Sequence, residues 1–315
     1  MKKYACIFPG QGSQEVGMVD PFLSSSATSD IFTAANESAG FDLMKLVQNG
    51  PQEELTLTYN AQPAILATSI VAWKELLKAI GSKISPAYLA GHSLGEFSAL
   101  TAAGALTIPD AIRLVRKRGQ LMQDAVPKDV GAMAALIGGT DHDVKNLVDA
   151  TSAGEILDIA NLNAPGQTVI SGQKSAVQRA MEKSGEYGIK RAIPLEVSAP
   201  FHSRLMKPVR EKFSRELEDI DFNLPDWPVV HNVNAQPNMD NGLFHEMLST
   251  QIESPVRWVE SIEFMLDAGV EAFIEIGHGN VLQGLVKKIA GRDWDGVICG
   301  VSSPDDLEDV VKKIS

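Results

Sequence analysis

The most informative stretch of this chain is residues 88–103, which read YLAGHSLGEFSALTAA. Apolar residues lead into a Gly-x-Ser-x-Gly turn at residues 91–95, and a helix-like segment follows from Glu96. A strand, a sharp turn and a helix in this order lift a serine hydroxyl above the edge of a sheet. The pattern therefore predicts an α/β fold in which Ser93 is a nucleophile. The alternative is a plain glycine-rich turn between a strand and a helix.

Short apolar runs alternate with helix-like stretches towards both ends of the chain, which is typical of an α/β fold. We predict strands at residues 4–8, 88–90, 229–233, 272–276 and 297–299, and helices at residues 96–103, 281–289 and 304–314.

The middle of the chain follows a different order. We predict a strand at 132–137, a helix at 141–150, strands at 156–160 and 168–171, a helix at 173–184 and a strand at 190–197. This βαββαβ order is that of the ferredoxin-like unit. We therefore predict an α/β-hydrolase-like large domain with a parallel sheet, made of residues 1–126 and 199–315. A small ferredoxin-like α+β domain, residues 127–198, is inserted into it.

The composition excludes several classes of protein. The 315 residues carry a net charge of −12, whereas general nucleic-acid binding needs a basic surface. No apolar run approaches the roughly 20 residues that span a bilayer, and the first apolar run breaks at Pro9. Cys6 and Cys299 are too far apart in sequence to suggest a disulfide framework or a metal site. We expect a cytoplasmic protein, and the acidic surface is compatible with a monomer.

A serine nucleophile needs a base, and the six histidines are the candidates. His92 is adjacent to Ser93 and should point elsewhere, and His142 begins a predicted exposed helix. His202 is favoured because it lies where the chain leaves the small domain and re-enters the large one. His231 and His278 stay open as alternatives at this point, and they are respectively in a predicted strand and in a glycine-rich turn.

Three motifs together resemble the malonyl-CoA:acyl carrier protein transacylase family, which includes the acyltransferase domains of polyketide and animal fatty acid synthases. They are residues 8–14 (FPGQGSQ), 91–96 (GHSLGE) and 199–203 (APFHS). The resemblance covers nearly the whole chain. It implies transfer of a malonyl group to the phosphopantetheine thiol of acyl carrier protein through a malonyl-serine intermediate, in support of fatty acid biosynthesis. It implies neither a metal nor a bound cofactor.

The resemblance also implies roles for individual residues. Ser93 matches the nucleophile and His202 the general base, and the main-chain carbonyl at Gln251 matches the group that orients the histidine. The backbone N–H groups of Gln11 and Leu94 match the oxyanion hole. The positions that match substrate-binding residues are Arg118, Gln62, Asn163 and the loop at residues 164–167.

Elementary chemistry supports the role of Arg118. A guanidinium binds the free carboxylate of a malonyl group through two parallel hydrogen bonds, whereas an acetyl group would leave it buried and unpaired. Helical spacing places Arg118 on a different face from Arg116 and Lys117, so it can point inward alone. Phe201 resembles the bulky residue of malonyl-selective members. One departure is the turn at residues 277–280 (GHGN), where the family usually has Gly-Pro-Gly.

Two other functions stay open, namely a polyketide-pathway acyltransferase that acts in trans and a serine thioesterase or hydrolase. Because carrier proteins are acidic, as is this chain, docking requires a locally basic patch. The candidates for it are Arg113, Arg116, Lys117, Lys190, Arg191, Arg204, Lys207, Lys287 and Lys288.

Overall fold

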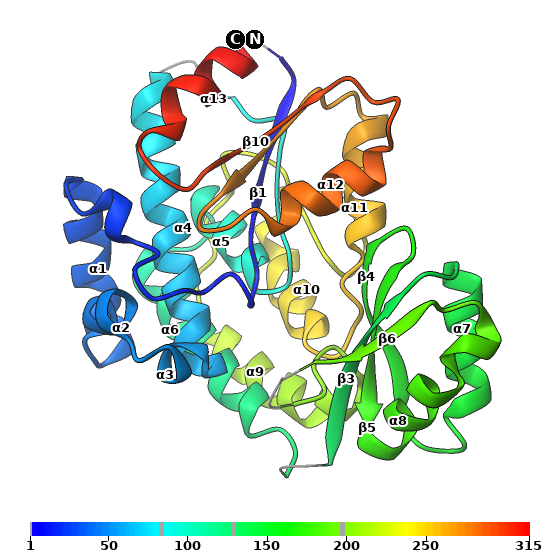
Figure 1. Ribbon diagram of the computed structural model, residues 1–315. Helices are drawn as coiled ribbons and strands as arrows, with labels where there is room; N and C mark the ends of the chain where they lie inside the picture. Colours follow the sequence, from blue (N-terminus) through cyan, green and yellow to red (C-terminus); the bar gives the residue numbers. More distant parts are fainter. Residues whose placement is uncertain (1, 82–84, 128–129, 196–198) are drawn as a thin grey trace.

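The computed structural model describes residues 2–81, 85–127, 130–195 and 199–315, and Figure 1 shows their arrangement. Within these residues, six strands form one sheet in the order β10-β9-β1-β2-β7-β8. All neighbours in it are parallel except β7 and β8, which pair antiparallel. Its strands are β1 Tyr4–Phe8, β2 Tyr88–Gly91, β7 Val229–Val230, β8 Pro237–Asn238, β9 Ala272–Ile276 and β10 Val297–Val301.

Helices cover both faces of this parallel sheet, as parallel sheets require. Side chains alternate along β1, so Cys6 and Phe8 pack into one apolar cluster with α4 and α5, whereas Ala5 and Ile7 pack into another with α11 and α12. The helices of this part are α1 Ser26–Ala39, α2 Leu43–Asn49, α3 Gln52–Thr56, α4 Thr58–Ile80, α5 Leu94–Ala102, α6 Ile108–Gln123, α9 Lys207–Glu218, α10 Phe244–Gln251, α11 Trp258–Asp267, α12 Val281–Ala290 and α13 Asp306–Ile314.

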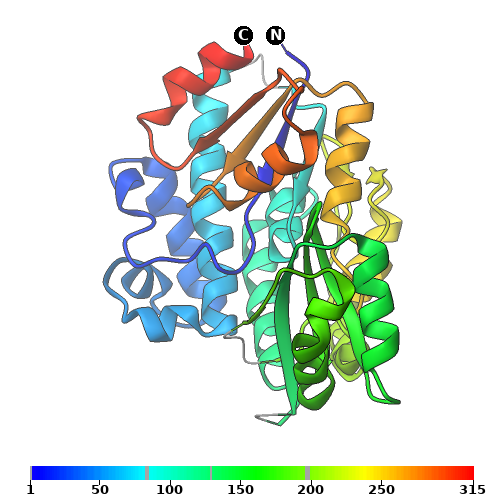
Figure 2. The same ribbon diagram turned by 45° about the vertical axis from the view of Figure 1, so that its right-hand side comes forward.

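The middle of the chain forms a second, antiparallel sheet in the order β4-β5-β3-β6. Its elements are β3 Gly131–Ile137, α7 Asp141–Thr151, β4 Leu157–Ala164, β5 Gln167–Gln173, α8 Lys174–Lys183 and β6 Arg191–Pro194. Helices α7 and α8 cover one face through a separate apolar cluster that includes Ala134 and Ile170, while Met133 and Val169 pack on the main core. Figure 2 shows this sheet beside the lower part of the main unit.

The two ends of the chain lie together in the unit with the parallel sheet. The N–H of Lys2 donates to the carbonyl of Ile314 at 2.8 Å, and both termini appear at the top of Figure 1. The middle segment joins this unit through β4, where Val256 pairs with Asn161. The active-site residues described below come from both sides of this junction.

Several predicted bounds differ from the structure for local physical reasons. The strand predicted at 229–233 ends at Val230, because the N–H of Asn232 bonds the Glu96 side chain rather than a neighbouring strand. The helix predicted from Glu96 already begins at Leu94. The strand predicted at 156–160 extends as β4 to Ala164. The strand predicted at 190–197 spans Arg191–Pro194, and its predicted end falls partly outside the described residues.

Candidate active site

Ser93 occupies a strained turn between β2 and α5. Its φ of 52° and ψ of −105° are unusual for a residue with a side chain, and such strain is typical of functional sites. Flanking glycines permit the close approach that this turn needs. A Cβ on Gly91 would lie 1.9 Å from the Gly95 carbonyl carbon, and one on Gly95 would lie 2.1 Å from the Phe8 oxygen. Asn232 secures the turn, since it accepts from the Ser93 N–H at 2.8 Å and donates to the Gly91 carbonyl at 2.7 Å.

His202 is the histidine that reaches the serine. Its Nε2 lies 2.8 Å from the Ser93 Oγ. Its Nδ1 lies 3.0 Å from the Gln251 carbonyl oxygen and 3.1 Å from that of Ser254. Because a carbonyl can only accept, Nδ1 carries the proton and Nε2 is left to accept from the serine hydroxyl. The Gln251 carbonyl ends helix α10, where carbonyl groups lack intrahelical donors, so it can occupy the place that an acid has in a catalytic triad.

The electrostatic surroundings keep His202 neutral. Burial, reinforced by the positive charge of Arg118, lowers its pKa to about 3. The imidazole is therefore unprotonated at pH 7 and able to take a proton from Ser93.

Arg118 lies on the other side of the same hydroxyl. This arginine on α6 is 1% exposed, and its Nη2 donates to the Ser93 Oγ at 3.0 Å. Nη1 donates to the Gln62 Oε1 at 2.9 Å, and Nη2 also donates to the Gln251 Oε1 at 2.9 Å. Burial lowers its pKa to about 10, so the guanidinium stays charged at neutral pH. A buried cation beside a nucleophile is suited to bind an anionic group of the substrate.

A cavity of about 220 Å³ opens onto these groups. Its lining includes the predicted residues Gln11, Leu94, Arg118, Phe201 and His202, together with Ser93. Leu94 is the first residue of α5, so its position at the helix N-terminus favours a developing negative charge. The structure thus brings the predicted nucleophile, base, oxyanion-hole residues and arginine to one cavity.

Two of the predicted substrate contacts lie differently. Gln62 is 1% exposed, and its side chain accepts a hydrogen bond from Arg118. The Oδ1 of Asn163 instead accepts a hydrogen bond from the Nε2 of His92 at 2.7 Å. Asn163 lines a neighbouring cavity of about 250 Å³, which shares Gln11 and His92 with the first. Gln167, from the predicted loop, also lines it.

The alternative histidines have other partners. The Nδ1 of His231 lies 2.7 Å from a carboxylate oxygen of Glu96, and both side chains are fully buried. His278, in the divergent turn, bonds Glu15 at 3.0 Å near the surface. Neither imidazole forms a hydrogen bond with the Ser93 Oγ, which contacts His202 and Arg118 instead.

Three residues that hold the site in place were not identified from the sequence, namely Glu96, Asn232 and Ser254. Glu96 could have been identified from the sequence, because it is a charged residue in an otherwise apolar first turn of α5, three residues after the serine. Asn232 and Ser254 could not have been, because they reach the site across more than a hundred residues from the turn.

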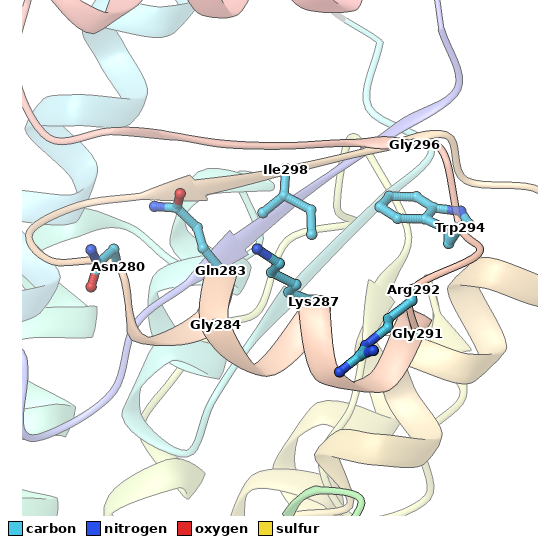
Figure 3. A pocket seen from close by; sticks show the side chains of 9 residues that line it. All are labelled: Asn280, Gln283, Gly284, Lys287, Gly291, Arg292, Trp294, Gly296 and Ile298. Carbon is cyan, nitrogen blue, oxygen red and sulfur yellow. The ribbon is translucent and has the colours of Figure 1, made fainter.

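A cavity larger than the one beside Ser93 lies next to α12. It has a volume of about 650 Å³, and its lining includes Lys287, Arg292, Trp294 and Ile298, which Figure 3 labels. Its lining contains no serine or histidine, so the chemistry described above belongs to the smaller cavity.

The described residues contain neither a metal-binding cluster of side chains nor a helix that could cross a membrane. Across that part of the chain, no group of three or more His, Cys, Asp or Glu side chains is placed to hold a metal ion. Likewise, none of the helices there combines the length and apolar character that crossing a membrane requires.

The chain is similar to known proteins over nearly its whole length. Residues 5–297 match the family model of the acyl transferase domain. Malonyl CoA-acyl carrier protein transacylase of Bacillus subtilis strain 168 is 47% identical over 310 residues, which are 98% of this chain and 96% of that protein. The Escherichia coli K12 protein of the same name is 44% identical over 290 residues, which are 92% of this chain and 93% of that protein.

Solved structures are similar over the whole fold. An acyl carrier protein S-malonyltransferase from Vibrio cholerae has a TM-score of 0.93 and 44% identity, and the match covers 98% of this chain and 99% of that one. A malonyl-transacylase in complex with its type II polyketide synthase acyl-carrier protein has a TM-score of 0.93 and 40% identity, with the same coverage of both chains.

Proposed function

The chain belongs to the acyl transferase family, and on that premise we propose that it transfers a malonyl group from malonyl-CoA to acyl carrier protein. One observation carries the proposal. The Ser93 hydroxyl oxygen lies within 3.0 Å of both a neutral imidazole nitrogen and a buried guanidinium. A base on one side and a cation on the other suit a serine that accepts an acyl group bearing a carboxylate.

In the first half-reaction, the carboxylate of malonyl-CoA binds Arg118. His202 takes the Ser93 proton at Nε2 while Oγ attacks the thioester carbonyl carbon. The backbone N–H groups of Gln11 and Leu94 stabilise the resulting oxyanion. The carbon–sulfur bond then breaks, and coenzyme A leaves as a thiol with the proton from His202.

In the second half-reaction, the phosphopantetheine thiol of the carrier takes the place of coenzyme A. His202 removes the thiol proton, the sulfur attacks the malonyl-serine ester, and Ser93 leaves with the proton returned by His202. The polarised Gln251 carbonyl at the end of α10 supports the transient imidazolium in both halves.

We propose fatty acid biosynthesis as the pathway, because the curated relatives are malonyl CoA-acyl carrier protein transacylases. The solved relative in complex with a polyketide synthase carrier is the observation that favours a second pathway. Transfer rates to the two kinds of carrier, measured side by side, distinguish them. Nothing observed favours the thioesterase or hydrolase.

We further propose the finer assignments of fold and setting. The unit with the parallel sheet, residues 1–126 and 199–315, is α/β-hydrolase-like, and residues 127–198 form a ferredoxin-like insertion, which the strand order β4-β5-β3-β6 supports. The chain acts as a cytoplasmic monomer without a metal, a cofactor or nucleic acid. These assignments stay predictions.

Steady-state kinetics test the proposed reaction. Initial rates with both malonyl-CoA and carrier varied should give parallel double-reciprocal lines, because coenzyme A leaves before the carrier reacts. Ser93→Ala should abolish transfer. Intersecting lines would contradict the malonyl-serine intermediate.

A further inference from the structure

Glu96 is a buried carboxylate next to the turn that holds Ser93. It is 0% exposed and lies on the first turn of α5, three residues after Ser93. Three donors surround it, namely the Nδ1 of His231 at 2.7 Å, the N–H of Asn232 at 2.9 Å and the Nε2 of Gln251 at 2.8 Å. A buried carboxylate with three donors is the pattern of an ionised group whose desolvation is offset by hydrogen bonds.

The side-chain amide of Gln251 links this carboxylate to the arginine. Its Nε2 donates to Glu96 and, at 3.1 Å, to the Ser93 carbonyl, while its Oε1 accepts from the Arg118 Nη2. If the amide were rotated by half a turn, its NH₂ would face the guanidinium and its oxygen would face two acceptors. Glu96, together with the Ser93 carbonyl, therefore favours the orientation in which the amide oxygen meets Arg118.

Arg118 in turn depends on these oriented oxygens. Among the described residues, its three hydrogen-bond acceptors are the neutral atoms Gln62 Oε1, Gln251 Oε1 and Ser93 Oγ. Since a guanidinium has five N–H donors, this arrangement fixes its plane and leaves donors for an incoming carboxylate. The negative charge of Glu96 raises the pKa of Arg118, which opposes the lowering by burial.

We propose that Glu96 is a positioning residue for malonyl specificity, which acts through Gln251 to keep Arg118 aimed at the malonyl carboxylate. The inference rests on the proposed function and adds to it a residue that contacts neither the substrate nor the reacting atoms. An alternative role for Glu96 is to support the loop after β7 through its hydrogen bonds with His231 and Asn232. Loss of that support would slow all acylation of Ser93, whereas loss of positioning weakens only substrates that carry a carboxylate.

Glu96→Gln tests the proposal, because it removes the charge and keeps a side chain of the same shape. The measurement is the second-order rate of Ser93 acylation by malonyl-CoA and by acetyl-CoA, followed by mass spectrometry. We expect the malonyl-to-acetyl ratio to fall by at least about tenfold, with the acetyl rate changed by less than about twofold. Glu275→Gln is the matched control. Glu275 is another buried glutamate, which accepts from the N–H groups of Leu282 and Gln283, and its variant should keep the ratio.

Gln251→Met is a second variant, which tests the proposal even if Glu96→Gln does not fold. It removes the amide and keeps the main-chain carbonyl that contacts His202. It too should lower the ratio. A preserved ratio in folded Glu96→Gln overturns the proposal, whatever Gln251→Met does. If Glu96→Gln does not fold, a preserved ratio in Gln251→Met overturns it and a lowered ratio supports it. A lowered acetyl rate with an unchanged ratio also overturns it.

Arg118→Ala separates this inference from the proposed function. If its ratio stays at the wild-type value, the role of Arg118 in the proposed function fails. If Arg118→Ala abolishes the preference while Glu96→Gln retains it, only the positioning role fails.

Discussion

At the scale of single residues, Gln251 connects the two halves of the site. Its main-chain oxygen accepts from the His202 Nδ1, and its side-chain oxygen accepts from the Arg118 Nη2. The Ser93 Oγ lies between the imidazole and the guanidinium that these bonds orient. The proposed base and the proposed specificity group are therefore held by one residue, so a substitution of His202 or of Arg118 should report on a separate step.

Arg118→Lys should weaken malonyl transfer although it keeps a positive charge. An ammonium group is a point donor and cannot make the two parallel bonds of a guanidinium, nor reach Gln62 and Gln251 together. We expect kcat/KM for malonyl-CoA to fall by about 100-fold, equivalent to about 3 kcal/mol. Steady-state kinetics with malonyl-CoA check this, and a value within twofold of the wild type would contradict the bidentate role.

The pH dependence should reflect the lowered pKa of His202. As pH falls, the imidazole protonates only near a pKa of about 3 in the free protein, so kcat/KM should stay level through the range around pH 6.5 where an ordinary histidine titrates. The positive charge of Arg118 is one cause of the lowered His202 pKa, and a bound malonyl carboxylate would offset that charge. The acid limb of kcat should therefore lie at higher pH than that of kcat/KM. An acid limb of kcat/KM at pH 6.5 would contradict this electrostatic account.

At the scale of elements, the β2–α5 turn was predictable because its information is local. The glycines, the serine and the surrounding apolar residues are contiguous, so the turn and the position of Ser93 in it could be predicted from the sequence. Asn232 bonds this turn from 139 residues away, and its position follows from the strand β7 that precedes it. The role of His202 likewise depends on a carbonyl 49 residues away. Long-range contacts of this kind leave no periodic signal.

Gly95→Ala should destabilise the protein through the contact of α5 with β1. The added Cβ would meet the Phe8 carbonyl oxygen at 2.1 Å, which forces the helix away from the sheet. Overpacking of this kind costs about 3 kcal/mol. Gly284→Ala in α12 is the control, since a Cβ there has nothing within 4 Å and should stabilise the helix by up to about 1 kcal/mol. Urea unfolding measures both, and equal stabilities would contradict the packing argument.

At the scale of the whole molecule, the sequence predicted the mixed α/β architecture and a separate sheet in the middle of the chain. The alternating strands and helices carried that prediction, and the structure has one mainly parallel and one antiparallel sheet. The two-residue strand β8 was not predicted, because it is too short to establish a period. The helices α1 to α4 and α9 to α11 were not predicted either, although α1 has 14 residues and α4 has 23. Helices α1, α2 and α3 pack against α4, and α1 also packs against α6.

Carrier docking is a property of the surface as a whole. Lys190 and Arg191 on the middle segment and Lys287 on α12 are exposed, whereas Arg204 pairs with Asp158 and Lys117 with Glu216. We predict that charge reversal at Lys190, Arg191 or Lys287 raises KM for the acidic carrier severalfold, because complementary charge promotes encounter. The rate of Ser93 acylation by malonyl-CoA should be unchanged. Equal effects on both half-reactions would contradict a docking role.

In the proposed mechanism, Ser93 carries the malonyl group between the two half-reactions. Intact-protein mass spectrometry after brief incubation with malonyl-CoA, without carrier, detects this intermediate. We predict an increase in mass of one malonyl group in the wild type, which is absent in Ser93→Ala and much weaker with acetyl-CoA. Release of coenzyme A without an adduct would indicate hydrolysis, and neither adduct nor release would contradict the proposed substrate.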